Sequence, residues 1–190
     1  MTNKKANQKR SSEKPGPVRP AQQDTKPLHG PHPAILQLGN PVLRSPAILV
    51  KDFDSQLKKL AEQMIEIMQQ ASGVGLAAQQ IGSIRRICII PGQEDKPLVL
   101  VNPTLKNLDG GNQPAIEGCL SLYGLQLPVE RQLAVQVQAQ DLSGQEIEFK
   151  AEGLQARAVQ HEIDHLNGIL IIDRVSPQLR WMALKQLIQS

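Results

Sequence analysis

The stretch RAVQHEIDHLNG, residues Arg157–Gly168, contains the pattern His-Glu-x-x-His. Residues four apart in a helix lie on one face, so the imidazoles of His161 and His165 would lie side by side and offer two metal ligands. Glu162 would be near enough to exchange a proton with a water activated by that metal. A surface helix with two unrelated histidines is the simpler interpretation, and the pattern alone leaves it open.

A hydrolytic metal site needs a third protein ligand. No histidine follows His165, and the only later carboxylate, Asp173, is expected at the end of a strand. The upstream candidate is Cys119 in EGCLS, 42 residues before His161. A thiolate is a strong ligand for zinc or ferrous iron, and a turn after Gly118 would leave backbone amides free to face a ligand.

The segment GVGLAAQQIG, residues 73–82, has two glycines that allow close backbone approach. The uncharged amide of Gln80 is suited to donate a hydrogen bond to a carbonyl oxygen that develops negative charge. The segment on its own favours a plainer interpretation, in which a helix ends, a tight turn follows and Gln80 is exposed.

Hydrophobic periodicity predicts an α+β fold. An amphipathic helix is expected from Asp54 or Ser55 to Gly73, a second helix over residues 154–166 with Gly168 as its C-cap, and a short third helix from Ser176–Pro177. Strands are expected at RRICII (85–90, with Cys88 buried), PLVLVN (97–102) and ILIID (169–173). The alternation of QLAVQVQAQD (132–141, with Leu133 among its inward residues) and QEIEFKA (145–151) predicts a hairpin.

The basic pI belongs to the N-terminal tail. Residues 1–30 carry seven Lys/Arg against two acidic residues, a net charge of +5, whereas residues 31–190 carry fourteen Lys/Arg against sixteen Asp/Glu, a net charge of −2. We expect residues 1–33 to be disordered and residues 34–190 to form one catalytic domain. The domain has no basic stripe for sequence-specific nucleic-acid binding, and no apolar run approaches the length of a membrane span.

Taken in order, GVGLAAQQIG, EGCLS and QHEIDHLNG resemble the three signature segments of peptide deformylase, and ILQLGNPVLRSPA (35–47) resembles the N-terminal segment of that family. The resemblance covers roughly residues 34 to 175. It implies antiparallel and mixed sheets packed around the His-Glu-x-x-His helix, and one divalent metal, most often Fe²⁺, that Zn²⁺, Ni²⁺ or Co²⁺ can replace. It also implies a hydrolase of protein biosynthesis that removes the N-formyl group from the starting methionine of nascent polypeptides and releases formate.

The resemblance also implies roles for individual residues. Cys119, His161 and His165 match the metal ligands, and Glu162 matches the catalytic acid/base. Gln80 and the backbone N–H of Leu120 match the groups that polarise the formyl oxygen. The remaining matches are Gly75 and Glu117, which line the substrate groove, and Val74 and Ala158, which map to the methionine pocket. The chain departs from the family after EGCLS, where LYGLQLPVER (122–131) replaces a small residue and proline; Arg131 is expected to lie too far along to position the peptide.

Two other kinds of protein remain open. A metalloprotease would share the His-Glu-x-x-His pattern but lacks its downstream ligand here, and a metal-free binding protein would not need the ligand and catalytic groups that are all present. A deformylase of bacterial type is expected in the cytoplasm, or in an organelle if the tail is a transit peptide. The short C-terminal helix would make at most a transient contact with the ribosome.

Overall fold

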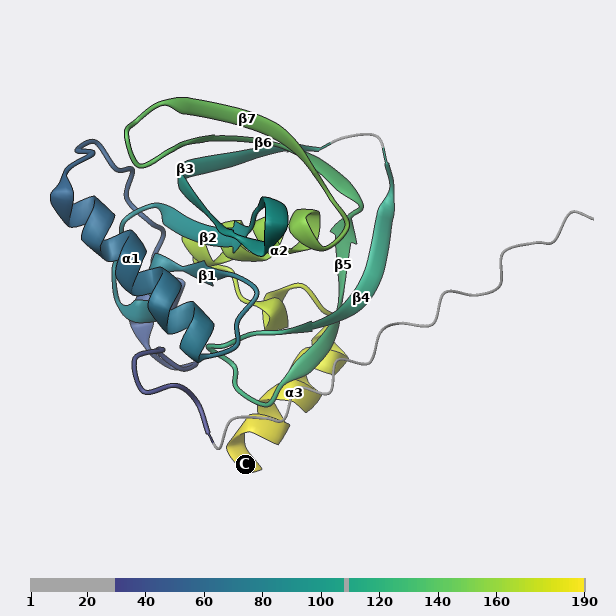
Figure 1. Ribbon diagram of the computed structural model, residues 1–190. Coiled ribbons are helices and arrows are strands. Elements are labelled where there is room, and N and C mark those ends of the chain that lie inside the picture. The colour runs from purple at the N-terminus through teal and green to yellow at the C-terminus, as the bar shows by residue number, and fades with distance from the viewer. Residues whose placement is uncertain (1–29, 108–109, 190) are drawn as a thin grey trace, which may run out of the picture.

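The computed structural model describes residues 30–107 and 110–189. A five-stranded antiparallel sheet has the order β1-β2-β3-β6-β7, and a second sheet pairs β4 with β5 (Figure 1). The strands are β1 (Leu76–Ala77), β2 (Ile87–Pro91), β3 (Pro97–Asn107), β4 (Asn112–Gly118), β5 (Gln126–Gln132), β6 (Ala134–Gln140) and β7 (Glu146–Glu152). The α-helices are α1 (Ser55–Gln70), α2 (Gly153–Leu166) and α3 (Pro177–Gln189). Short 3₁₀ helices are η1 (Pro41–Arg44), η2 (Ala78–Ile81), η3 (Gln93–Asp95) and η4 (Ile171–Asp173). The predicted α+β class is confirmed.

Strand β2 lies between two layers of core. Ile87 and Ile89 pack in a cluster with the buried face of α1, whereas Cys88 and Ile90 pack in a second cluster with the buried face of α2. This alternation follows from the two-residue period of a strand, and it explains why β2 is apolar at every one of these positions. The prediction that Cys88 is a buried strand residue is confirmed.

The predicted N-terminal helix is present. The Asp54 side chain caps α1 by accepting a hydrogen bond from the Leu57 amide at 2.9 Å. The helix ends close to the predicted Gly73, whose amide donates to the Met68 carbonyl at 2.8 Å. The chain then turns directly into β1, where Leu76 pairs with Ile89 and holds the glycine-containing segment beside the central sheet.

The hairpin formed by β6 and β7 is also as predicted, with the Asp141 carboxylate accepting hydrogen bonds from the amides of Ser143 and Gln145 in its turn. Strand β6 begins at Ala134, two residues later than expected, and Leu133 is 43% exposed instead of facing the core. Strands β4 and β5 were not expected from the sequence. Their pairing places EGCLS at the end of β4, with Cys119 immediately after Gly118.

The predicted strand at residues 169–173 is wrong. Residues Ile171–Asp173 form the 3₁₀ helix η4, because the Asp173 carboxylate accepts a hydrogen bond from the Leu170 amide at 2.8 Å and closes a helical turn. Ile171 and Ile172 are buried in a third cluster, beside β5 and α3. Their apolar character therefore reflects burial in a helical turn and not membership of a sheet.

The end of α2 and the start of α3 lie where their flanking residues indicate. Helix α2 stops before Gly168, which has a left-handed φ of 73° and approaches Arg44 so closely that an added Cβ would lie 2.5 Å from the Arg44 carbonyl oxygen. Helix α3 begins at Pro177, and the Leu179 amide donates to Ser176 Oγ.

Among the described residues, no helix is long and apolar enough to cross a membrane. The predicted tail lies, up to residue 29, outside the described residues.

Candidate active site

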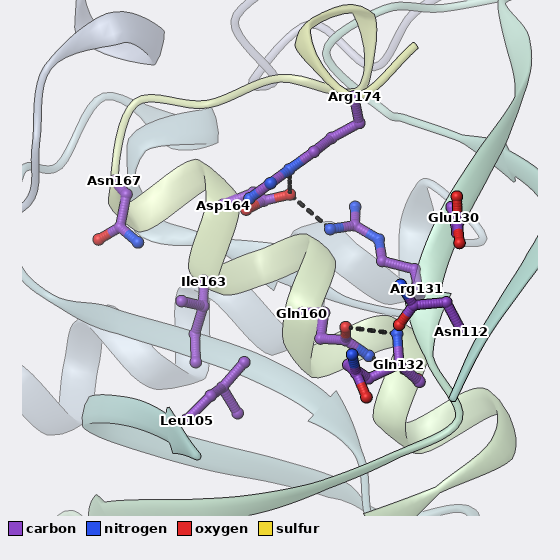
Figure 2. A pocket seen from close by; sticks show the side chains of 10 residues that line it. All are labelled: Leu105, Asn112, Glu130, Arg131, Gln132, Gln160, Ile163, Asp164, Asn167 and Arg174. Carbon is purple, nitrogen blue, oxygen red and sulfur yellow. Dashed lines mark hydrogen bonds and ion pairs between the residues drawn. The ribbon is translucent and has the colours of Figure 1, made fainter. Parts of the chain in front are cut away.

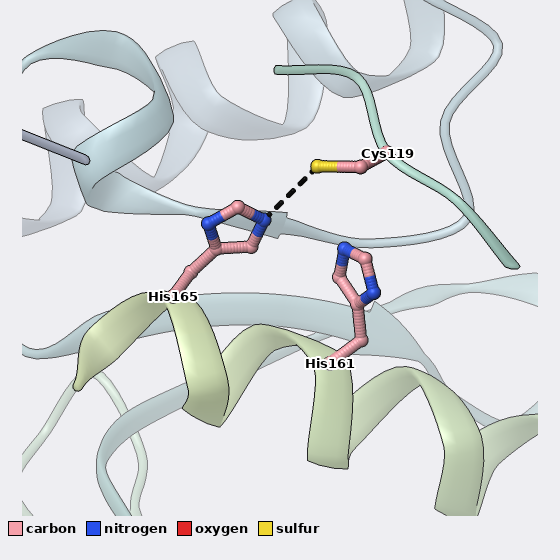
Figure 3. A group of neighbouring side chains, drawn as sticks. All are labelled: Cys119, His161 and His165. Atoms are coloured by element: carbon pink, nitrogen blue, oxygen red, sulfur yellow. Dashed lines mark hydrogen bonds between the residues drawn. The ribbon is translucent and has the colours of Figure 1, made fainter. Parts of the chain in front are cut away.

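Three potential metal ligands come together from two elements. His161 and His165 lie on successive turns of α2, and Cys119 follows β4 (Figure 3). Their ligand atoms all lie within 4.8 Å of one another, and Cys119 Sγ lies 3.2 Å from His165 Nε2. The structure therefore brings the two helix histidines together with a cysteine that lies 42 positions before His161 in the sequence.

Glu117 holds the first histidine. Its Oε2 lies 3.1 Å from His161 Nδ1, which leaves the other ring nitrogen for the ligand cluster. Burial alone would raise the pKa of Glu117, but hydrogen bonds from His161 and Arg131 outweigh it and lower the pKa to about 2. Glu117 is thus an ionised, buried carboxylate and does not lie on an open groove surface.

Arg131, which was expected to lie too far along the chain to position the peptide, is a buried member of the site. Its guanidinium donates twice to Glu117, at 2.9 Å each, and also pairs with Asp164 on α2. Asp164 in turn pairs with Arg174, and Arg157 pairs with Glu117. The alternation of QLPVERQ, which directs Leu127, Val129 and Arg131 inward, is the sequence signal that marks this arginine as buried.

This charged network borders a pocket on α2, of about 350 Å³ (Figure 2). The pocket is lined by Leu105, Asn112, Glu130, Arg131, Gln132, Gln160, Ile163, Asp164, Asn167 and Arg174. Arg131 and Asp164 join it to Glu117, and through Glu117 to His161. The ion pairs here are buried or half-buried, so they rigidly connect the end of β5 with α2.

Glu162 is a buried carboxyl, and one of its two oxygens has no hydrogen-bond partner among the described residues. It is 3% exposed, and its Oε2 accepts no hydrogen bond from the described residues. Burial raises the pKa of Glu162 to about 7, although nearby His161 and Arg131 act in the opposite direction. A carboxyl with a pKa near neutrality can both take up and release a proton under physiological conditions.

Gly75 packs directly against this carboxyl. A Cβ atom at Gly75 would lie 2.5 Å from Glu162 Oε1, so any larger residue would displace the carboxylate. Val74, beside it, is 49% exposed, whereas Ala158 is 7% exposed on α2, within the core cluster that includes Ile163. Of the two residues expected at the methionine pocket, Val74 is thus exposed on the loop and Ala158 is buried on the helix.

Gln80 is buried and oriented. It is 1% exposed, contrary to the interpretation in which it lies on an exposed turn. Its Oε1 accepts a hydrogen bond from the Ala77 amide at 2.8 Å, so that Nε2 faces Ser121 Oγ at 3.3 Å and Cys119 Sγ at 3.9 Å. The Leu120 carbonyl is fixed by a 3.0 Å hydrogen bond from the Gln37 side chain. Gln80 therefore borders the ligand cluster, and Leu120 directly follows Cys119 in the chain.

The donor set fits a divalent transition metal. One thiolate and two imidazoles suit Zn²⁺ or Fe²⁺, and three protein ligands leave a position open for chemistry. Burial lowers the pKa of His165 well below its ordinary value, with the charge of His161 acting in the same direction. A neutral imidazole is the form that binds a metal.

Comparison with known proteins agrees with this geometry. A family model described as polypeptide deformylase matches residues 33–181. This chain belongs to the polypeptide deformylase family. It is 45% identical, over 140 residues, to a peptide deformylase of Dictyoglomus thermophilum, and the match covers 74% of this chain and 90% of that protein.

Solved deformylase structures share the fold. The peptide deformylase of Legionella pneumophila superposes with a TM-score of 0.76 at 41% identity, covering 82% of this chain and 92% of that one. The peptide deformylase of Synechococcus elongatus, solved in complex with actinonin, has a TM-score of 0.76 at 40% identity, with 85% and 90% coverage. This deformylase is therefore a metal-dependent hydrolase that removes the N-formyl group from nascent polypeptides, and the metalloprotease alternative is not favoured.

Proposed function

We propose that Cys119, His161 and His165 bind the single divalent metal of this deformylase, and that the native ion is Fe²⁺. The main support is that their donor atoms lie within 4.8 Å of one another beside the buried Glu162. When bound, the metal supplies a Lewis acid for the formyl oxygen and lowers the pKa of water toward neutrality. Sulfur and nitrogen donors suit iron and zinc alike, and iron follows from the family resemblance.

Glu162 is assigned as the acid/base. It takes a proton from the attacking water as the new C–O bond forms at the formyl carbon. It then gives this proton to the methionine nitrogen as the C–N bond breaks, so that formate and a free amine leave. Its burial supports this role, because a pKa of about 7 makes both transfers accessible near neutral pH.

Gln80 and the Leu120 amide are assigned to the formyl oxygen. Gln80 Nε2 is directed toward Cys119 because the opposite end of the amide is held by the Ala77 N–H. A donor that is oriented before the reaction stabilises developing negative charge without reorganising. The Leu120 carbonyl is anchored by Gln37, and this supports a fixed orientation for the neighbouring peptide group.

Substrate binding is assigned to the loop and helix residues that border Glu162. Gly75 would line the groove, and Val74 and Ala158 would adjoin the methionine side chain. Glu117 would contribute indirectly, by orienting the His161 ring. Its carboxylate is hydrogen-bonded to Arg131, Arg157 and His161.

We further propose that residues 34–190 form one catalytic domain and that the enzyme acts in a bacterial-type cytoplasm, or in an organelle if the N-terminal tail is a transit peptide. A transient contact with the ribosome would use the exposed face of α3, where Trp181 and Met182 are 64% and 60% exposed. Cosedimentation with ribosomes, compared between wild type and a Trp181→Ser, Met182→Ser variant, tests this contact.

One assay tests the assignment as a whole. Protein loaded with Fe²⁺ under anaerobic conditions is incubated with formyl-Met-Ala-Ser, and released formate is measured, with casein cleavage as the control for protease activity. We expect formate from wild type and none from Cys119→Ser, which should also lose its metal on dialysis. Metal analysis of anaerobically purified protein identifies the native ion; absence of iron would overturn that part of the proposal.

A further inference from the structure

Gln79 lies in η2 and is completely buried. Its Nε2 donates to the His165 carbonyl at 2.8 Å and to the Ser45 carbonyl at 3.1 Å. Because two carbonyl oxygens face this end of the amide, Nε2 and not Oε1 must occupy it. Gln79 therefore connects the last turn of α2 with the segment that follows η1.

Two complementary atoms in this region have no hydrogen-bond partner among the described residues. One is Gln79 Oε1, an acceptor, and the other is His165 Nδ1. Buried polar atoms are normally paired, by protein or by an ordered water. The two residues are already joined through the His165 carbonyl, so an unused acceptor and an unused ring nitrogen belong to directly contacting residues.

The two histidines differ in how their second nitrogen is supported. His161 Nδ1 has Glu117 at 3.1 Å, whereas His165 Nδ1 has no such carboxylate. His165 Nε2 points to Cys119, and Nδ1 lies on the other side of the ring, away from the ligand cluster (Figure 3). When Nε2 binds a metal, Nδ1 carries the proton and requires an acceptor that orients the ring.

We propose that Gln79 is the positioning residue for His165. Its amide nitrogen holds the backbone of the ligand, and its oxygen is the acceptor for the Nδ1–H, reached through one buried water or a small rotation of the ring. This inference rests on the proposed metal site. Each histidine ligand then has its own hydrogen-bond acceptor for Nδ1–H. The acceptor for His161 is the charged Glu117, and the acceptor for His165 is the neutral Gln79.

The test uses Co²⁺-loaded protein, because the visible absorption of Co²⁺ reports ligand geometry, and measures metal release to excess EDTA. Gln79→Met keeps the size of the side chain but removes the amide, and Gln79→Asn keeps the amide on a shorter side chain and withdraws it from His165. We expect both to release Co²⁺ about tenfold faster, the scale typical for supports of metal ligands, with a changed Co²⁺ spectrum. The matched control is Gln155→Met, which removes a 2.7 Å hydrogen bond from α2 to the Pro91 carbonyl.

Wild-type release and spectrum in both Gln79 variants would overturn the inference. Equally fast release from Gln155→Met would overturn it as well, because weakened anchoring of α2 would then be the cause. Cys119→Ser is measured alongside as the test of the metal site itself. If that variant retains Co²⁺ as wild type does, the proposed ligand set fails; if it loses Co²⁺ while the Gln79 variants behave as wild type, only the role of Gln79 fails.

Discussion

Glu117 Oε2 lies 3.1 Å from Nδ1 of His161, and the same carboxylate receives two hydrogen bonds from the Arg131 guanidinium. The strand pairing of β4 with β5 places Glu117 opposite Leu127 and Arg131 on the same buried side, so the long arginine side chain reaches the carboxylate along the small sheet. The ring of His161 is thereby fixed with its other nitrogen toward Cys119. Orientation of a ligand by an ionised carboxylate strengthens metal binding.

Glu117→Gln should weaken the metal site. A neutral amide cannot reproduce the ionised pair with His161, so we expect metal affinity to fall about 10- to 100-fold. Competition with a chromophoric chelator measures this affinity. Glu130→Gln is the matched control, because Glu130 is exposed on β5 and contacts neither histidine. Equal affinities for the two variants would contradict the role of Glu117.

Glu162→Gln should keep the metal and lose turnover. The amide preserves shape but cannot shuttle a proton, and loss of a general acid/base typically costs about 10²- to 10⁴-fold in rate. Formate release and metal content are measured on the same preparation. Retention of most activity with full metal content would show that another group transfers the proton.

Gly75→Ala should impair catalysis through Glu162. The new Cβ would lie 2.5 Å from Glu162 Oε1, so the carboxylate must move. Displacement of a reacting group by about 1 Å can cost roughly 10²-fold in rate. We expect kcat for formyl-Met-Ala-Ser to fall while metal content stays that of wild type. An unchanged kcat would show that Glu162 has room to adjust.

Asp173→Asn should lower stability at neutral pH but not in acid. Partial burial would raise the pKa of Asp173, but hydrogen bonds from Arg44 and the Leu170 amide outweigh it and hold the pKa below its usual range. A lowered folded-state pKa stabilises the protein above the unfolded pKa of about 3.9, and this contribution is lost as pH falls through the folded value. Because the Arg44 side chain is 39% exposed, solvent screens the pair and the loss is about 1 kcal/mol or less.

Urea unfolding of metal-free wild type and Asp173→Asn, in parallel at pH 7 and in acid, measures this difference. The gap in unfolding free energy should close as the pH drops below about 4. Glu94→Gln, which removes an exposed pair with Lys96, serves as the control and should show no such closing gap. A gap that persists in acid would mean that Asp173 acts through packing and not through its charge.

The sequence alone predicted those features that depend on local spacing. The four-residue interval between His161 and His165 places both on one helix face whatever surrounds them. Capping by Asp54 and termination at Gly168 likewise depend on neighbouring residues, and the β6–β7 hairpin follows from alternation around a turn. Cys119 could be selected as the third ligand because no suitable residue follows the helix.

Tertiary structure decided which polar groups are buried and what they contact. Gln80 on its own was better explained as exposed, and it is buried because β1 pairs with β2 and carries η2 into the core. Arg131 reaches Glu117 only through the pairing of β4 with β5. Desolvation and ion pairing act between residues distant in sequence, so spacing identified the groups that can react, and packing decided their orientation and charge.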